Sequence, residues 1–477
     1  MSGLFGSLHS SVNALNAHSR SIEIAGKNLA NISNSSYARQ RVIYGDRGTV
    51  VTPTGAQSLG LEALGVQQLR DALLDRQVVR ESALTAYYHA QQSGYQRAQA
   101  ALGQDISSTS RSAGTSSSTS DTGIAAALDD FFNAFQSFAG NPTDPGQRQS
   151  LLQTASLLTD RINLADTRLA QVQSDLDAQA ATDAGEANVL LQTIADLNGQ
   201  IARFEINNPG SAVDLRDQRQ ASLEKLAAKL PIETVANADG TLEVTTKDTG
   251  GNPVILVTGA TATGPLVFDG STTPPSVTAG TPATALAVRS GAIGGSISAR
   301  TGAIQELRDK LDLLVNQLVT SVNGAYNPTG TTGDFFDAAG TSAGTLALAA
   351  GLTASNLKAS DGGAAGDNSV ALAIAQLGTK RFSTSGAPPD LIDGSLGGFY
   401  SGAVSGLGQA LSGVNSRVTD QSSIENLVRS QRDAVSGVSL DEEMADLIKY
   451  QRAFQASSRV FTTIDNLLDL VVNQLAR

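Results

Sequence analysis

The sequence has no cysteine, no tryptophan and only three histidines. Without cysteine the chain cannot form disulfide bonds, thiolate metal sites or a cysteine nucleophile. The histidines, His9, His18 and His89, are not spaced as a metal-ligand motif. Aromatic residues make up 4% of the chain, too few to line a large aromatic ligand pocket. We therefore expect no metal and no cofactor.

Positive charge is also scarce, because 33 lysines and arginines are outnumbered by 45 aspartates and glutamates, for a formal net charge of −12. Nucleic acids and anionic lipid surfaces both require clustered lysine and arginine. No uninterrupted apolar run approaches the roughly 20 residues that a membrane span needs. The N-terminus lacks the basic segment and compact apolar core of a secretory signal peptide. We expect neither a nucleic acid nor a membrane as partner.

Large apolar residues do recur at every seventh position, at both ends of the chain. The N-terminal seam consists of Met1, Leu8, Leu15, Ile22 and Leu29. The C-terminal seam consists of Leu440, Leu447, Phe454, Phe461, Leu468 and Leu475. This spacing is typical of a helix that pairs in a coiled coil.

The longest pattern lies in the middle of the chain. Apolar residues at alternating spacings of three and four predict a helix over 147–206, on the order of 90 Å long. Such a helix needs partner helices along its length, and 213–230 supplies one candidate. Further helices are expected at 299–323 and near 398–433. The segment "SSTSRSAGTSSSTS" at 107–120 is expected to be a flexible linker.

Beyond Pro231 the composition changes to threonine, valine and glycine. "GTLEVTT" alternates apolar and polar residues, as a half-buried strand does, and "PVILVTG" follows after a glycine-rich turn. The fold class is therefore mainly α with an inserted β domain, combining paired terminal coiled-coil-like helices with a long-helix middle domain. The predicted domains are a terminal-helix domain (1–60 with 437–477), a helical middle domain (61–231 with 299–327 and 391–436), an inserted β domain (232–298) and an outer insertion (328–390).

Motifs for catalysis are missing, since the sequence contains no GxSxG, P-loop, GxGxxG or HExxH pattern. Asp441, Glu442 and Glu443 could suggest acid–base chemistry, but acidic residues in a first helical turn also complement the helix dipole, and we favour that interpretation. The charged run from Asp214 to Arg219 is expected to make local ion pairs on a helix. We expect no catalytic residue.

The two seams allow two interpretations. Each terminal helix could dock on its own domain core, or the two helices could pair with each other and with neighbouring subunits. Neither helix lies within a compact stretch of apolar sequence, and an exposed stripe of large apolar side chains promotes association. This favours the second interpretation, in which both seams form a self-assembly interface.

Two terminal stretches resemble a known family. "AGKNLANISNSSYARQRV" at 25–42 and "GVSLDEEMADLIKYQRAFQASSRVFTTIDNLLDLVV" at 437–472 are similar to the terminal motifs of the flagellar axial proteins, which build the rod, the hook and the hook–filament junction. Mid-chain stretches, among them "DTGIAAALDDFFNAFQSFAGNPTDPGQRQSLLQTA", "VDLRDQRQASLEKLAAKLPI" and "GAYNPTGTTGDFFD", resemble the hook-associated members in particular. Residues 328–390 match poorly.

The resemblance implies a structural subunit of the bacterial flagellum without enzyme activity, joining hook to filament as a mechanical adaptor. Its terminal helices would form an inner tube, in a homo-oligomeric ring or tubular layer. The hook protein would lie on one side, and the next junction protein and, through it, flagellin on the other. The chain would be exported unfolded by the flagellar type III apparatus to the cell exterior. We also expect an export chaperone to bind residues 440–477, because this apolar stripe would otherwise associate too early.

Two alternatives stay open from the sequence. A hook or rod protein would share the terminal motifs, although such proteins usually carry more β-structure and lack the long helix of 147–206. A secreted coiled-coil enzyme or adhesin would require a pocket with converging titratable groups, for which the sequence gives no sign.

Overall fold

A computed structural model gives the fold for residues 2–46, 48–52, 55–58, 60–103, 123–330, 333–362 and 366–473. The expected linker at 107–120 and the seam residues Met1 and Leu475 lie outside these described residues.

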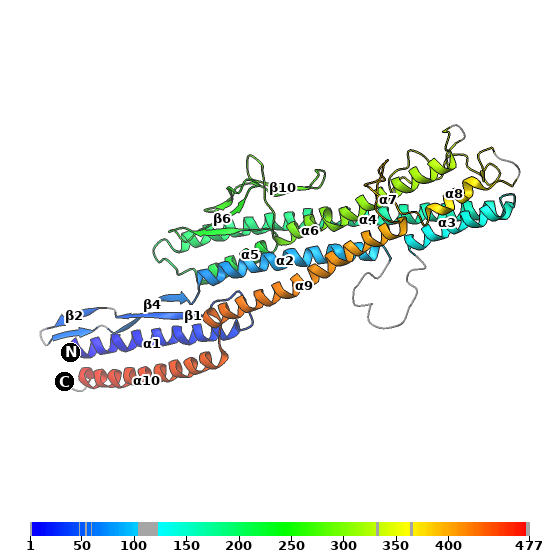
Figure 1. Cartoon of the computed structure of the whole chain (residues 1–477). Helices are drawn as coiled ribbons and strands as arrows, with labels where there is room; N and C mark the ends of the chain where they lie inside the picture. The colour runs from blue at the N-terminus through cyan, green and yellow to red at the C-terminus, as the bar shows by residue number, and fades with distance from the viewer. Residues whose placement is uncertain are drawn as a thin grey trace.

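The molecule is elongated, with both chain termini at the same end (Figure 1). Helices α1 (Ser2–Ala30) and α10 (Leu440–Asn473) lie side by side at that end and form what we call the terminal pair. The helices α2 to α9 form a long bundle, here called the rod. Its helices are α2 (Ala72–Ala101), α3 (Ile124–Gly140), α4 (Pro145–Phe204), α5 (Val213–Ala227), α6 (Gly291–Thr301), α7 (Ala303–Tyr326), α8 (Ser369–Leu377) and α9 (Leu396–Ser436).

The central helix of the rod is α4, which confirms the long helix predicted from the apolar spacing. It begins where Asp144 caps the helix, with its carboxylate accepting the Gly146 amide at 2.8 Å and Pro145 in the first turn. Its apolar stripe is buried along the whole length, from Leu151 at one end to Ile201 at the other. Because one helix spans the rod, it holds the cores at the two ends of the rod in a fixed relation.

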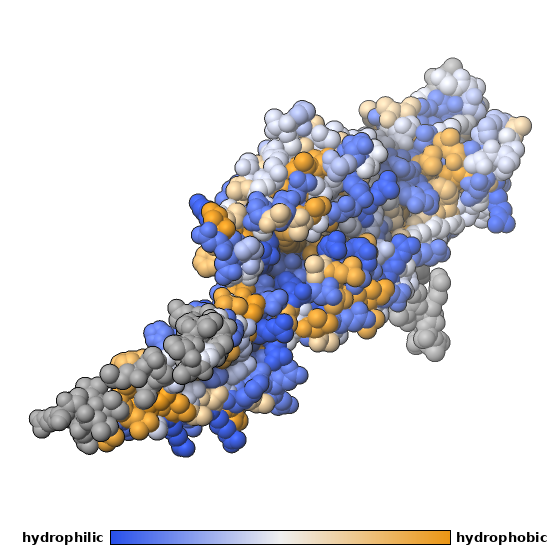
Figure 2. Space-filling model, turned by 90° about the vertical axis from the view of Figure 1, so that its left-hand side faces the viewer, coloured by the Kyte–Doolittle hydropathy of each residue, from blue (hydrophilic) through white to orange (hydrophobic). Residues whose placement is uncertain are grey.

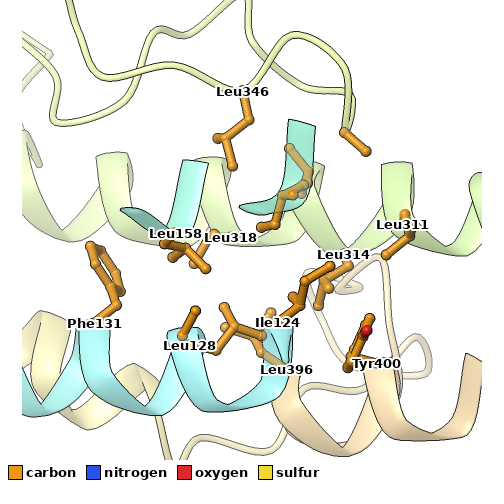
Figure 3. Close-up of a cluster of buried hydrophobic side chains, with 14 of the residues drawn as sticks. Ile124, Leu128, Phe131, Leu158, Leu311, Leu314, Leu318, Leu346, Leu396 and Tyr400 are labelled. Carbon is orange, nitrogen blue, oxygen red and sulfur yellow. The ribbon is translucent and has the colours of Figure 1, made fainter. Parts of the chain in front are cut away.

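The larger core fills the end of the rod far from the terminal pair. Phe131 of α3 lies among Phe135, Phe335 and Phe336, with ring centroids 5.1–5.8 Å away. Figure 3 shows aliphatic side chains of α3, α4, α7 and α9 converging on the same cluster. Residues 328–390 were expected to form an outer insertion, but the structure differs, since this segment supplies Phe335 and Phe336 to the core.

A second core lies between the other half of α4, α5 and two small antiparallel sheets. The sheets have the strand orders β5-β6-β7-β8 and β11-β10-β9. The strands are β5 (Glu233–Ala236), β6 (Leu242–Lys247), β7 (Pro253–Thr258), β8 (Thr261–Ala262), β9 (Val267–Asp269), β10 (Ser276–Ala279) and β11 (Thr284–Ala285). The inserted β region is therefore present, but it ends earlier than the expected 298, because helix α6 already begins at Gly291.

Strands also accompany the terminal pair. β1 (Gln40–Asp46) runs antiparallel to β4 (Leu61–Gln68), and β2 (Thr49–Thr52) pairs with β3 (Gly55–Ser58). Both β1 and β4 pack on α1. The expected boundary at 60 assigned residues 61–68 to the helical middle domain. In the structure these residues lie with the terminal helices instead.

Candidate assembly interface

The terminal pair is formed by two antiparallel helices from opposite ends of the chain (Figure 1). The seam residues Leu8, Leu15, Ile22 and Leu29 are half-buried, as are Leu447, Phe461 and Leu468. Leu440 and Phe454 remain 52% and 37% exposed. The structure thus brings the two terminal helices together as expected. The role of these side chains in self-assembly stays a prediction.

The fully buried face of α1 is a different one. It carries mostly small or polar side chains: Ser11, Ala17, Ser21, Ile24, Ala25 and Asn28. Small side chains let neighbouring elements approach α1 closely, so the large apolar seam residues lie at the edge of this contact. Ser21 and Asn28 are seven residues apart, and so are Ala17 and Ile24, so this face also repeats in the sequence. It was missed because its residues are not strongly apolar.

Apolar side chains are exposed along α10 away from α1. The surface in Figure 2 has orange patches at its lower end, where the terminal pair lies. Those on α10 with large exposed fractions are Leu440, Met444, Ile448, Val460, Leu467 and Leu470. Side chains of this size on one helix make a surface that another protein can cover.

The "NLANISNSSYARQRV" segment forms the joint between the terminal pair and the rod. The buried side chain of Asn28 makes four hydrogen bonds there. Its side-chain nitrogen donates to the backbone carbonyl of Gln40 at 2.8 Å and to the Glu443 carboxylate at 3.0 Å. Its side-chain oxygen accepts from the Tyr37 hydroxyl at 2.8 Å and from the backbone amide of Gln40 at 3.0 Å. All polar positions of this side chain are therefore used, as burial requires.

Arg39 ties the same segment to the first turns of α10. Its guanidinium lies 2.6 Å from Glu442, 2.6 Å from the buried Glu443 and 3.4 Å from Asp446. The Arg39 amide also donates to the Ser436 carbonyl at 2.8 Å, at the end of α9. The acidic turn was interpreted as a complement to the helix dipole, and the structure adds a specific partner that the sequence could not identify.

Two arginines, one in α9 and one just before α2, hold the loop after α1. Arg432 of α9 donates to the Ser35 carbonyl at 2.7 Å and pairs with Glu224 of α5 at 2.7 Å. Arg70 donates to the Ser36 carbonyl at 2.9 Å. It also pairs with Asp75 at 2.9 Å and Asp217 at 2.6 Å. The joint is thus built from buried or half-buried ion pairs, whose loss of one partner is costly.

The charged run of α5 does not make the local ion pairs that were expected. Asp214 pairs with Lys27 of α1, and Asp217 with Arg70. Arg216 pairs with Glu205 at 2.6 Å, and Arg219 donates to Asn198 of α4 at 2.7 Å. Each partner lies outside α5, and the Asp214–Lys27 pair links this helix of the rod to α1 of the terminal pair.

The pKa values of the carboxyl groups in this network are shifted in opposite directions. Burial raises the pKa of Asp217 to about 6, against the attraction of Arg70. Burial alone would also raise the pKa of Glu205, but hydrogen bonds from Arg216 and from backbone amides lower it to about 2. Burial lowers the pKa of Arg219 to about 10. These side chains are structural partners of one another, and a cavity of about 300 Å³ lined in part by Arg70, Arg216 and Arg219 lies beside them.

Among the described residues, no group of three or more acidic or histidine side chains is arranged to hold a metal ion. The helices that the structure describes also include none with the length and apolarity needed to cross a membrane.

Comparison with known proteins shows which proteins the chain resembles. Residues 113–336 match the model of the flagellar hook-associated protein FlgK helical domain, and residues 429–475 match the flagellar basal body rod FlgEFG protein C-terminal model. Flagellar hook-associated protein 1 of Bacillus subtilis is 26% identical over 99% of both chains. The protein of the same name from Escherichia coli is 22% identical over 98% of this chain and 99% of its own.

A solved structure shares the fold. The flagellar hook junction protein FlgK from Burkholderia pseudomallei superposes with a TM-score of 0.59 at 14% sequence identity, covering 76% of this chain and 100% of that one. The helical-domain match, the nearly full-length relatives and this shared fold agree with one another. The chain is thus homologous, over nearly its whole length, to flagellar hook-associated proteins named FlgK.

Proposed function

We propose that this chain is a structural subunit of the bacterial flagellum, located outside the cell at the junction between hook and filament, and that it has no enzyme activity. The observation that carries the proposal is the terminal pair, which is joined to the rod by a polar network and presents apolar α10 side chains to its surroundings. Such a pair can build an inner tube when neighbouring copies cover those side chains. The similarity to flagellar hook-associated proteins supplies the flagellar context.

The partners follow from this position. Copies of the chain would form a ring or tubular layer through the terminal pairs. The hook protein would contact one side of the layer, and the next junction protein, followed by flagellin, the other. A hook or rod protein is the less suitable alternative, because the match over 113–336 is to the hook-associated helical domain.

Deletion of the gene tests the function. We expect hooks of normal appearance without filaments, and flagellin released into the medium, as seen by electron microscopy and immunoblotting. Re-expression of the full chain should restore filaments. Filaments of normal length in the deletion strain would refute the proposal.

An export chaperone bound to residues 440–477 is the finer part of the proposal. Before assembly the exposed apolar side chains of α10 need a cover, which a helix-binding groove can provide. A chain truncated after Val438 should lose chaperone binding in a pull-down, whereas a chain lacking residues 107–120 should keep it. Unchanged binding by the truncated chain would contradict this assignment.

A further inference from the structure

Four arginines line the cavity of about 300 Å³ that lies between the start of α2, helix α5 and strand β5. Arg70 lies just before α2 and Arg76 in its first turns. Arg216 and Arg219 come from α5. Asp75 is the acidic side chain of this wall. The cavity is therefore basic, in a protein whose formal net charge is −12.

The carboxylates around this cavity are already paired with two of its arginines. Arg70 pairs with Asp75 at 2.9 Å and with Asp217 at 2.6 Å. Arg216 makes two hydrogen bonds to Glu205, one from Nε at 2.8 Å and one from Nη2 at 2.6 Å. The other two arginines of the cavity form no ion pair within the described residues.

Arg219 is the buried member of this unpaired couple, since it is only 4% exposed. Its Nη1 donates to the side-chain oxygen of Asn198 at 2.7 Å and to the Gly240 carbonyl at 2.9 Å. Its Nε and Nη2 make no hydrogen bond to any described residue. Burial, followed by the positive charge of Arg216, lowers the pKa of Arg219 to about 10. A buried charge is stable when a counter-charge accompanies it, so this side chain calls for an anion.

Arg76 supplies the second unpaired guanidinium, at the side of the cavity that faces solvent. It is exposed, and its Nε donates to the Ala72 carbonyl at 3.2 Å, which leaves both Nη groups without a partner among the described residues. Because Arg76 is exposed and Arg219 buried, the cavity leads from solvent to the inner charge. Val79 and Leu223 add buried apolar surface to its wall, which strengthens an electrostatic attraction inside it.

We propose that this cavity binds one small tetrahedral oxyanion, of the phosphate or sulfate class, between Arg76 and Arg219. The two guanidinium groups come from different helices, and an anion whose oxygens point in several directions can accept from both. The cavity has room for such an anion together with several waters, each of which takes roughly 30 Å³. The bound anion would join α2 to α5 beside the ion pairs of Arg70. This binding goes beyond the proposed function and does not depend on it.

Isothermal titration calorimetry of the purified full-length chain tests the site. The probes are sodium phosphate, sodium sulfate and sodium acetate, each at constant ionic strength in a buffer free of the other oxyanions. We expect phosphate and sulfate to bind at one site per chain, and acetate to bind at least about tenfold more weakly because it offers fewer oxygens. Binding of neither oxyanion would overturn the proposal. Acetate binding as tightly as phosphate would also overturn it, because the cavity would then suit a carboxylate, such as one from a neighbouring chain.

An exposed arginine can be changed without disturbing the fold, so Arg76 gives the first variant. Arg76→Gln should raise the Kd for phosphate roughly tenfold, because it removes charge-assisted hydrogen bonds. Arg97→Gln, at an exposed position of the same helix outside the cavity, is the matched control and should keep the wild-type Kd. Equal affinities of the Arg76 variant and wild type would show that phosphate binds elsewhere.

A carboxylate built into the cavity gives a second test. Thr234 and Ala236 line the cavity from the same face of β5. Thr234→Glu places a negative charge among the arginines, so it should abolish phosphate binding. In phosphate-free buffer it should also unfold at a higher temperature than Thr234→Gln, which has the same size without the charge. A Thr234→Glu chain that binds phosphate with wild-type affinity, or that unfolds at the same temperature as the Thr234→Gln chain, would overturn the proposal.

Discussion

Asn28 and Glu443 are 415 positions apart in the sequence, and their side chains share a buried hydrogen bond of 3.0 Å. Asn28 lies in the last turn of α1 and Glu443 in the first turn of α10. The bond therefore links the two helices of the terminal pair at the point where both meet the rod. Glu443 also forms an ion pair with Arg39 at 2.6 Å. A hydrogen bond and an ion pair therefore both join the segment at 28–40 to α10.

Asn28→Ala should loosen this joint without unfolding the rod. The change leaves the Gln40 amide and the Tyr37 hydroxyl without their acceptor, at a cost of about 2–3 kcal/mol for buried groups. We expect the Gln40 amide to exchange with solvent roughly 10- to 100-fold faster, as measured by mass spectrometry or NMR. Asn16→Ala, at an exposed position of the same helix, is the control and should leave this rate unchanged. Equal rates in all three proteins would contradict the role of Asn28.

The seams should matter for assembly and not for folding of the rod. Leu15→Asp and Phe461→Asp each place a charge at a half-buried position of the terminal pair, where it lacks a partner. We expect each to block incorporation into flagella, measured by immunoblotting of isolated particles. The double variant should be no worse than either single one, since one charge already opens the pair. Ser19→Asp, exposed on α1, should incorporate normally.

The far core of the rod offers a matched pair of leucines for a stability test. Leu158 is fully buried, whereas its neighbour Leu157 is 46% exposed. Leu158→Ala should leave a cavity and lower the free energy of unfolding by about 2–5 kcal/mol. Leu157→Ala should change it by less than about 1 kcal/mol. Urea titration followed by circular dichroism measures both, and similar losses in the two variants would show that the core is placed wrongly.

The long helix could be predicted from the sequence almost to its ends, because apolar spacing along one element reports directly on that element. The prediction of 147–206 agrees with Pro145–Phe204. The fold class and the pairing of the terminal helices were predicted as well. These features depend on periodicity or on the resemblance of the two terminal motifs.

The joint could not be predicted in the same way. Asp217 and Arg219 look like members of a local charged run, yet their partners come from other elements. A pattern within one helix cannot say which distant charge becomes its partner. Residues 328–390 lack periodicity, so the packing of Phe335 and Phe336 into the core gave no signal beyond two adjacent phenylalanines. The small, polar buried face of α1 was missed because an apolar seam lies beside it.

The Glu205–Arg216 pair should make stability fall in acid. The pKa of Glu205 is about 2 in the folded chain and near 4.5 when unfolded, so the unfolded state binds the proton first as the pH falls. Its contribution, about 1–2 kcal/mol after allowing for the partly exposed Arg216, is complete above pH 4.5 and is lost as the pH falls towards 2. Urea titrations from pH 6 to pH 2 should show wild type losing its advantage over Glu205→Gln. If the difference in unfolding free energy between wild type and Glu205→Gln stayed constant with pH, the lowered pKa of Glu205 would be contradicted.

Asp217 should show the opposite dependence, because burial raises its pKa to about 6 in the folded chain. Between about pH 4 and pH 6 the folded state holds a proton that the unfolded state has released, so this group lowers stability as the pH rises through that window. An asparagine cannot titrate and keeps the shape of the neutral carboxyl group. The free energy of unfolding of Asp217→Asn, minus that of wild type, should therefore increase between pH 4 and pH 6, on the order of 2 kcal/mol. Asp217→Asn also loses the 2.6 Å contact with Arg70, which shifts the difference in unfolding free energy by a constant amount. The difference still increases as the pH rises. Urea titrations across this range measure it, and a difference that decreases as the pH rises would show that Arg70, and not burial, dominates at Asp217.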